Sequence, residues 1–170
     1  MIILLRHLLS IAILPFSVAV LVPVWIARRN GVVPALGQSM GEVALQLIGV
    51  VLFAVGFLLF AASLRRFVTE GDGTLAPWDP PRRLVVRGPY RFVRNPMISG
   101  LIFVLCSEAL ILLSRPHAEW AATFLLLNLI YIPLLEEPMM AARFGDDYRE
   151  YCRHVGRILP RLRAWQSSRS

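Results

Sequence analysis

Polar residues that could bind a charged ligand stand at the start of one apolar block of the sequence. Asn95 and Pro96 immediately precede the block at residues 98–113. Asn is a preferred N-cap of helices, and Pro is favoured at the first helical position. The pair therefore predicts a helix whose positive end and free backbone N–H groups would bind a carboxylate or a phosphate. A capped helix without a ligand is the alternative that this feature leaves open.

Two adjacent carboxylates, Glu136 and Glu137, follow the next apolar block, at residues 118–135. Acidic side chains at the negative end of a helix cost about 0.3–1 kcal/mol each, so we expect cationic partners, either Arg side chains or a bound cation. The connection at residues 114–117 is short, which predicts an antiparallel hairpin that brings Asn95 and Glu136 to one membrane face. An anion site beside a cation site suits a zwitterionic ligand.

A third carboxyl, Glu108, stands inside an apolar block, about 18 Å along a helix from Pro96. An intramembrane carboxyl is a functional candidate by default. Asn128 falls at a similar depth in the predicted hairpin, so we expect a hydrogen bond that clamps the two helices together. A catalytic role for Glu108 is the alternative.

The sequence has no pattern typical of metal, nucleotide or serine-hydrolase chemistry. The three histidines, His7, His117 and His154, are scattered and have no Cys or His at metal-ligand spacing, so no metal site is expected. Neither a P-loop nor a nucleophile elbow occurs. The positions of Cys106 and Cys152 make a structural disulfide improbable.

The elements that must position these residues are predicted from composition. The chain has 170 residues, of which 56% are hydrophobic, and its mean hydropathy is +0.61. Four apolar blocks have about 16 to 22 residues each, near the roughly 20 needed to cross a bilayer: residues 8–27, 43–64, 98–113 and 118–135. These features exclude a soluble globule, a disordered chain and a secreted disulfide scaffold. We expect an all-α integral membrane protein with about four transmembrane helices.

The charge distribution predicts which side of the membrane the polar segments face. The net charge is +7 and the chain has no Lys, while Arg gathers in residues 65–94 and 143–169. The positive-inside rule places both segments in the cytoplasm, beside anionic lipids, and this location disfavours a nucleic-acid partner. We expect a multi-pass protein of the bacterial inner membrane with both termini cytoplasmic.

The chain divides into an N-terminal transmembrane hairpin at residues 1–66 and a core at residues 67–170. The core begins with a cytoplasmic segment rich in Gly and Pro, which favour turns. This segment includes a short run, residues 84–86, whose composition favours β structure. After Gly145, apolar residues recur at helical spacing and predict an amphipathic helix along the interface, which would cover the polar segment. A helix that only anchors the tail is the alternative.

Three motifs together carry a family resemblance. They are Gly-Pro-Tyr-Arg-Phe-Val-Arg-Asn-Pro-Met-Ile-Ser-Gly at residues 88–100, the pair Glu136-Glu137, and Phe-Gly-Asp-Asp-Tyr-Arg-Glu-Tyr at residues 144–151, followed by Val155 and Pro160. Over about residues 71–160 the chain resembles the isoprenylcysteine carboxyl methyltransferase family. That family is grouped with the phospholipid methyltransferases among membrane enzymes that use S-adenosyl-L-methionine.

The resemblance implies a cofactor pocket formed by the segment before the third apolar block, the start of that block and the end of the fourth. Carried over by matching position, the residues implied to contact S-adenosylmethionine are Arg82, Arg83, Leu84, Val85, Tyr90, Asn95, Pro96, Met97, Ile98 and Glu136. A donor with a carboxylate, an ammonium and a sulfonium agrees with the zwitterionic site derived from the residues themselves.

The chain departs from the family pattern at four positions. The family often has His at the position of Asn95, Tyr at that of Ile98 and Pro at that of Gly156. An Arg that binds the substrate carboxylate in isoprenylcysteine enzymes falls on Ile132. A prenylcysteine carboxylate is therefore a doubtful substrate for this chain.

The leading hypothesis is methyl transfer to a lipid-like or prenylated acceptor that enters from the membrane. A carboxylate acceptor would need a cationic clamp, for which Arg94 and Arg143 are candidates. An amine acceptor would need a base, for which Glu137 is the candidate, and the loss of the clamp at Ile132 favours an amine, a thiol or another nucleophile. The alternatives are a nicotinamide-dependent membrane reductase related to sterol reductases and a non-catalytic membrane interaction protein.

Overall fold

The structure is a computed structural model that describes residues 12–70 and 83–166, and over these residues it is helical. No strand occurs in the described ranges, so the run at residues 84–86 forms no sheet there, and an isolated β-bridge joins Val93 to Gly156. The elements in chain order are η1 (Ala12–Leu21), α2 (Val22–Arg29), α3 (Met40–Glu70), η2 (Gly88–Arg91), α4 (Pro96–Ile111), α5 (Arg115–Tyr131), η3 (Ile132–Glu136) and α6 (Glu137–His154).

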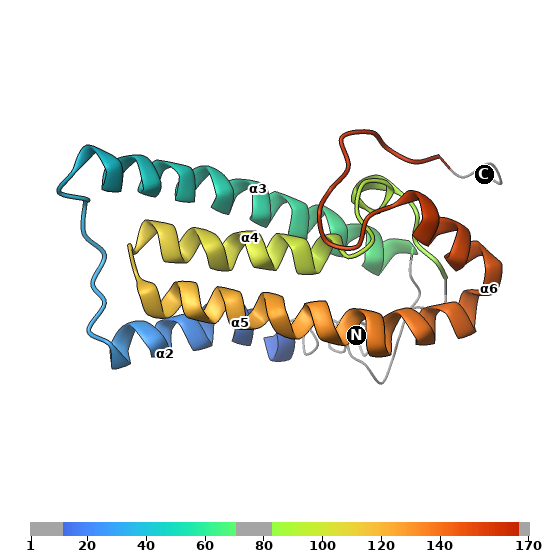
Figure 1. The fold of residues 1–170 in the computed structure, drawn as a ribbon, viewed down its shortest axis with the longest axis horizontal. Helices are drawn as coiled ribbons and strands as arrows, with labels where there is room; N and C mark the ends of the chain where they lie inside the picture. The colour runs from blue at the N-terminus through green and yellow to red at the C-terminus, as the bar shows by residue number, and fades with distance from the viewer. Residues whose placement is uncertain (1–11, 71–82, 167–170) are drawn as a thin grey trace.

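Three long helices, α3, α4 and α5, lie lengthwise beside one another, and α2 lies along the first part of α5 (Figure 1). Among the described residues, the helices at Met40–Glu70 and Arg115–His154 are long and apolar enough to cross a membrane. Helix α4 is apolar but has 16 residues, and the first predicted block begins outside the described residues. The count of four spans therefore stays a prediction, as does the division into residues 1–66 and 67–170.

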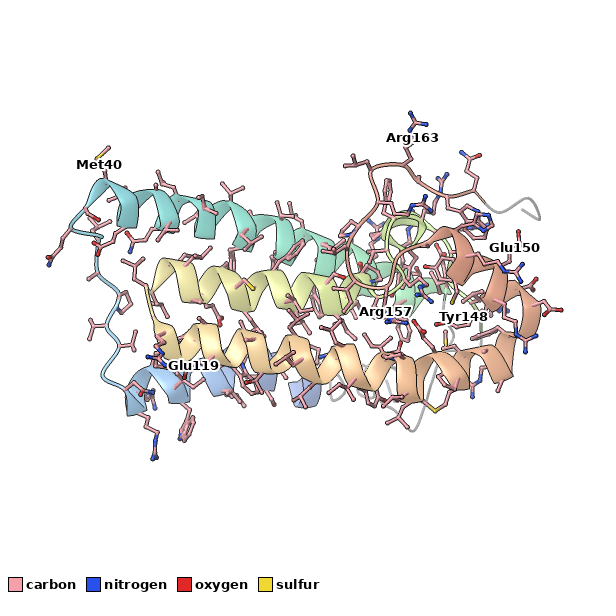
Figure 2. The ribbon with its side chains drawn as sticks, in the orientation of Figure 1. Met40, Glu119, Tyr148, Glu150, Arg157 and Arg163 are labelled. Carbon is pink, nitrogen blue, oxygen red and sulfur yellow. The ribbon has the colours of Figure 1, made fainter. Side chains whose placement is uncertain are left out.

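Apolar side chains cover the outside of the bundle, while charged residues lie at its two ends. Leu47, Leu58 and Leu134 are among the exposed apolar residues of α3 and η3. Met40 and Glu119 lie at one end, and Tyr148 and Arg157 at the other (Figure 2). An apolar belt between two polar ends is the pattern that a bilayer requires.

The predicted hairpin between the third and fourth apolar blocks is present. Helix α4 ends at Ile111 and α5 begins at Arg115, and Leu113 turns the chain with a φ of 48°. The buried His117 ring holds this turn: Nδ1 lies 2.7 Å from Ser114 Oγ, and Nε2 lies 3.2 Å from the Pro23 carbonyl oxygen. The turn is thereby tied to α2, and the ends of α4 and α5 that carry Asn95 and Glu136 lie at the opposite end of the bundle.

Helices α3 and α4 approach each other closely because small residues meet at their crossing. A Cβ atom on Gly56 would lie 2.8 Å from the Gly100 carbonyl oxygen, and one on Gly100 would lie 2.7 Å from the Gly56 carbonyl oxygen. Ser63 and Ser99 are fully buried beside this crossing. Small residues at such crossings allow the dispersion contacts that hold helices together in lipid. The crossing fixes the first turn of α4 against α3.

The C-terminal tail folds back over the segment that precedes α4 (Figure 1). Backbone N–H groups of Arg94 and Asn95 donate to Gly156 and Arg157 at 2.8 and 3.2 Å, and Trp165 N–H donates to the Arg91 carbonyl at 2.9 Å. Covering of the polar segment was predicted for a helix after Gly145. Over the described residues, the helix and the tail both contact this segment: Tyr151 of the helix donates to the Tyr90 carbonyl, and the tail makes the backbone hydrogen bonds above.

The predicted amphipathic helix after Gly145 is present, as the second part of a longer, broken helix. Helix α6 begins at Glu137, directly after η3, and Gly145 is a break inside it with φ 57° and ψ −131°. Tyr148, Tyr151 and Val155 form a buried cluster on the part after the break. A glycine is needed at this break because a left-handed φ strains residues that carry a Cβ. An amphipathic helix therefore follows Gly145 as predicted, and a further helical stretch, from Glu137 to the break, precedes it.

Adding one methyl group at the α3–α4 crossing should destabilise the protein. We expect Gly56→Ala to lower the free energy of unfolding by about 1–3 kcal/mol, because the new Cβ collides with backbone. Gly41→Ala is the matched control: its Cβ meets only Ser39 Oγ at 3.9 Å, and alanine favours the helix. Thermal unfolding in detergent measures both variants, and equal unfolding temperatures would contradict the close crossing.

Candidate functional site

A cavity of about 930 Å³ opens at the α6 end of the bundle, between α3, α4, η3, α6 and the segment before α4. Its volume lies within the range of small-molecule sites, about 300–1,000 Å³. Nine of the ten residues implied to contact a cofactor are described by the structure, and all nine line this cavity: Arg83, Leu84, Val85, Tyr90, Asn95, Pro96, Met97, Ile98 and Glu136. Arg82 lies outside the described residues.

The start of α4 contributes a helix end without a side-chain cap. Asn95 occupies the N-cap position and Pro96 begins the helix, as the sequence predicts, but the Asn95 side chain makes no capping hydrogen bond. Its Nδ2 instead donates to the Arg157 carbonyl oxygen at 3.3 Å. Nearby, Ser99 Oγ donates to the Ile158 carbonyl oxygen at 2.6 Å. The tail thus takes the side chain that was expected to cap, and the positive end of α4 faces the cavity.

The two adjacent glutamates have different surroundings. Glu136 lines the cavity, and within residues 12–70 and 83–166 its carboxylate makes no hydrogen bond or ion pair. Glu137 is not among the lining residues and is bound by arginines. Arg157 Nε and Nη2 donate to its two oxygens at 2.7 and 2.9 Å, and Arg94 Nη1 lies 3.1 Å from Oε1. Successive helical residues point about 100° apart, which explains the division.

The ion-pair cluster of Arg94, Glu137 and Arg157 contains two cations and one anion. Arg94 is the member that lines the cavity, and its side chain is only 10% exposed. Its Nη1 also donates to Cys152 Sγ, while its Nε is buried without a partner in the described part of the chain. The hydrogen bonds that Arg157 donates to the Glu137 carboxylate raise the pKa of Arg157. The cluster therefore presents a fixed, incompletely neutralised positive charge to the cavity.

A second unpaired donor in the cavity is the Tyr90 hydroxyl. Tyr90 is 7% exposed, and the structure shows no partner for its hydroxyl among the residues described. The Tyr90 carbonyl oxygen accepts a hydrogen bond from Tyr151 Oη at 2.5 Å, which holds the Tyr90 backbone in place. Burial and the nearby Glu136 carboxylate raise the pKa of Tyr90, so the phenol keeps its proton. A buried donor left unpaired is costly, which points to a ligand acceptor.

Several lining residues were not predicted as site residues. Arg143 was predicted and does line the cavity, and beside it α6 contributes Met139, Met140 and Tyr148. Helix α3 contributes Phe60 and Phe67. The helical spacing of Tyr148 and Tyr151 was interpreted only as an amphipathic face. The same spacing could have indicated that both tyrosines face the cavity. Nothing in the sequence distinguishes Phe60 and Phe67 from the lipid-facing residues of α3.

The predicted clamp between Glu108 and Asn128 is wrong. Asn128 Nδ2 donates to the Phe124 carbonyl oxygen of its own helix at 2.8 Å, and Glu108 Oε2 is buried without a partner in the described ranges. The two side chains line different cavities: Asn128 lines the 930 Å³ cavity, and Glu108 lines a second cavity. Sequence depth along a helix does not determine the direction in which a side chain points around the axis.

Two other positions bear on the chemistry. Ile132, where isoprenylcysteine enzymes have a substrate-binding Arg, is fully buried and packs with Ile102 and Ile158 instead of lining the cavity. No group of three or more His, Cys, Asp or Glu side chains is placed to hold a metal ion in the part of the chain that the structure describes. The site is therefore built from Arg, Glu, Tyr and backbone N–H groups.

Comparison with protein families identifies the class of protein. The phospholipid methyltransferase family matches residues 45–147, from the first turns of α3 to just beyond the break in α6. This match covers more than half of the chain, so the chain belongs to the phospholipid methyltransferase family, a family of membrane methyltransferases. The resemblance found in the sequence is thereby confirmed, and with the apolar helices it makes this a membrane protein. No match was found among curated proteins.

Breaking the ion-pair cluster should cost more than breaking an exposed pair. We expect Glu137→Gln to lower the free energy of unfolding by about 1.5–3 kcal/mol, because Arg94 and Arg157 lose a shared, partly buried counter-charge. The matched control is Glu119→Gln, which breaks the exposed pair with Arg115 and should cost below about 1 kcal/mol. Denaturant unfolding in detergent compares them, and equal losses would contradict the role of the cluster.

Proposed function

We propose that this protein transfers a methyl group from S-adenosyl-L-methionine to a lipid-like acceptor at the α6 end of the bundle. One observation carries the proposal: Arg94 Nε and Tyr90 Oη, buried donors without a partner among the described residues, belong to side chains that line the same cavity as the Glu136 carboxylate. A cavity with donors for an anion and an acceptor for a cation fits a zwitterion. The family supports methyl transfer as the reaction.

The residues present fit this methyl donor. Arg94, Tyr90 and the first turn of α4 would hold the donor's carboxylate, since each offers N–H or O–H groups to the cavity. Glu136 would hold its ammonium and face the sulfonium charge. When bound, S-adenosylmethionine supplies an electrophilic methyl group, so the protein need not activate that carbon. What remains for the protein is to orient the acceptor and exclude water.

The structure favours different roles for the three residues proposed to act on the acceptor. Glu137 is held by two arginines, so we assign it the positioning of Arg94 in place of proton transfer. The carboxylate that faces the cavity is Glu136, which is already assigned to the donor's ammonium, so we assign no base for an amine acceptor among the described residues. Arg143, on α6, lines the cavity and is the clamp for an anionic acceptor group.

The acceptor's chemistry is constrained by Ile132. This residue is part of the apolar core between α4, η3 and the tail, so no cation occupies its position beside the cavity. A carboxylate acceptor would depend on Arg83 or Arg143, the other arginines that line the cavity, because Arg94 is assigned to the donor's carboxylate. This favours an amine or another neutral nucleophile on a lipid-like molecule.

We further propose that the α6 end faces the cytoplasm of a multi-pass protein. Arg157, Arg161 and Arg163 lie in the tail at this end, where the positive-inside rule expects them. The N-terminal unit also belongs to the site, because Pro15 and Val18 of η1 line the cavity. Residues on both sides of the proposed division at residue 66 therefore line the pocket.

Titration calorimetry with S-adenosylhomocysteine tests the proposal. We expect the folded protein to bind this product, and Glu136→Gln to bind it about tenfold more weakly, because one charge-assisted contact is lost. Glu150→Gln, on α6 outside the cavity lining, is the matched control and should bind as the wild type does. Absence of binding by folded wild type would overturn the proposal, and binding of NADPH in its place would favour a reductase.

The Tyr90 hydroxyl separates binding from stability. We expect Tyr90→Phe to weaken S-adenosylhomocysteine binding without lowering the unfolding temperature, because the hydroxyl has no partner to lose among residues 12–70 and 83–166. Tyr151→Phe is the counterpart: it removes the hydrogen bond to the Tyr90 carbonyl and should lower the unfolding temperature. Calorimetry and thermal unfolding are measured on both variants, and unchanged affinity in Tyr90→Phe would contradict the assigned role.

A further inference from the structure

A second cavity, of about 530 Å³, adjoins the first and extends away from the α6 end. Helices η1, α2, α3 and α4 form its walls, and Pro15, Phe60 and Leu101 line both cavities. Apart from these shared residues, its walls are mostly aliphatic and aromatic side chains, such as Phe53 and Val104. The two cavities are therefore neighbours. Both have mostly apolar walls, but the first also holds several charged and hydroxyl groups, so we call it the polar compartment and the second the apolar compartment.

One carboxyl, Glu108, lines this apolar compartment. Its Oε2 is buried and has no hydrogen-bond partner in residues 12–70 and 83–166. The nearby basic side chain on the cavity wall, His117, has both ring nitrogens engaged, with Ser114 and with the Pro23 carbonyl. Glu108 is therefore not balanced by that histidine.

Neither water nor a plain hydrocarbon explains an unpaired carboxyl in this position. A buried water needs two to four polar partners, and the walls offer few polar groups. A hydrocarbon chain would fill the space but would leave the carboxyl oxygen without a partner, which costs free energy. The occupant that satisfies both the walls and Glu108 is an apolar chain that carries a hydrogen-bond donor.

We propose that the methyl acceptor is an elongated amphiphile whose hydrocarbon chain fills the second cavity and carries a hydrogen-bond donor that Glu108 accepts. The inference rests on the proposed function and names the acceptor class of that same site. Along α4, Glu108 lies about 18 Å from Pro96. The acceptor thus has two polar groups: the methylated one beside Glu136, and a second one further along the chain.

Chemical labelling of Glu108 tests the occupant. N,N′-dicyclohexylcarbodiimide, an apolar reagent for buried carboxyls, is added to the full-length protein in lipid nanodiscs, and Glu108 labelling is followed by peptide mass spectrometry. We expect 1-dodecanol to protect Glu108 at about a tenfold lower concentration than dodecane, since only the alcohol supplies a donor. Equal protection by both probes, or none by either, would overturn the proposal.

Substitutions in the second cavity provide an independent test. We expect Glu108→Leu to abolish the preference for 1-dodecanol over dodecane and Ala19→Trp, which fills the cavity, to abolish retention of both probes, measured by native mass spectrometry. The matched control is Ala62→Trp, at an exposed position of α3 outside both cavity linings. An unchanged preference in Glu108→Leu would also overturn the proposal.

The two proposals fail in distinguishable ways. S-adenosylhomocysteine binding depends on the first cavity, so it should be unchanged in Glu108→Leu, while transfer of a labelled methyl group into a lipid extract should fall about tenfold. Binding of S-adenosylhomocysteine without selective protection by 1-dodecanol would overturn the acceptor class alone. Loss of S-adenosylhomocysteine binding in folded wild type would overturn the methyltransferase function.

Discussion

The ion pair of Glu137 with Arg94 and Arg157 joins the three segments on which the cavity depends. Arg94 belongs to the segment before α4, Glu137 begins α6, and Arg157 lies in the tail. A partly buried carboxylate stabilises the fold only when its oxygens are hydrogen-bonded, and here both Glu137 oxygens accept hydrogen bonds from Arg157. Because Glu137 takes the arginines, the adjacent Glu136 is left to the cavity.

The close crossing of α3 and α4 gives this ion pair a rigid support. In lipid, helices are not driven together by the hydrophobic effect, so dispersion contacts and hydrogen bonds must hold them. At Gly56 and Gly100 the two backbones are too close to admit a Cβ, and Ser99 ties the same turn to the tail. The positive end of α4 and the Arg94 guanidinium therefore keep fixed positions relative to each other.

The meeting of Asn95 and Glu136 could be predicted from the sequence, because a short connection forces two helices into a hairpin. Side-chain direction could not. Whether Asn95 caps its helix depends on the tail, which competes for its amide, and the division between Glu136 and Glu137 depends on helix rotation. The Glu108–Asn128 clamp failed for the same reason, since depth follows from residue number but rotation follows from packing.

The polar and apolar compartments differ in how much of each lies within the family match. Residues 45–147 include the start of α4, Tyr90, Arg94 and Glu136, which form the polar compartment. Much of the apolar compartment comes from η1 and α2, at Ala12–Leu21 and Val22–Arg29, which lie outside the match. Of the described residues of η1 and α2, Pro15 and Val18 also line the polar compartment, so the rest of this wall can change its shape with little effect there. Selection of the acceptor is thereby structurally separable from recognition of the methyl donor.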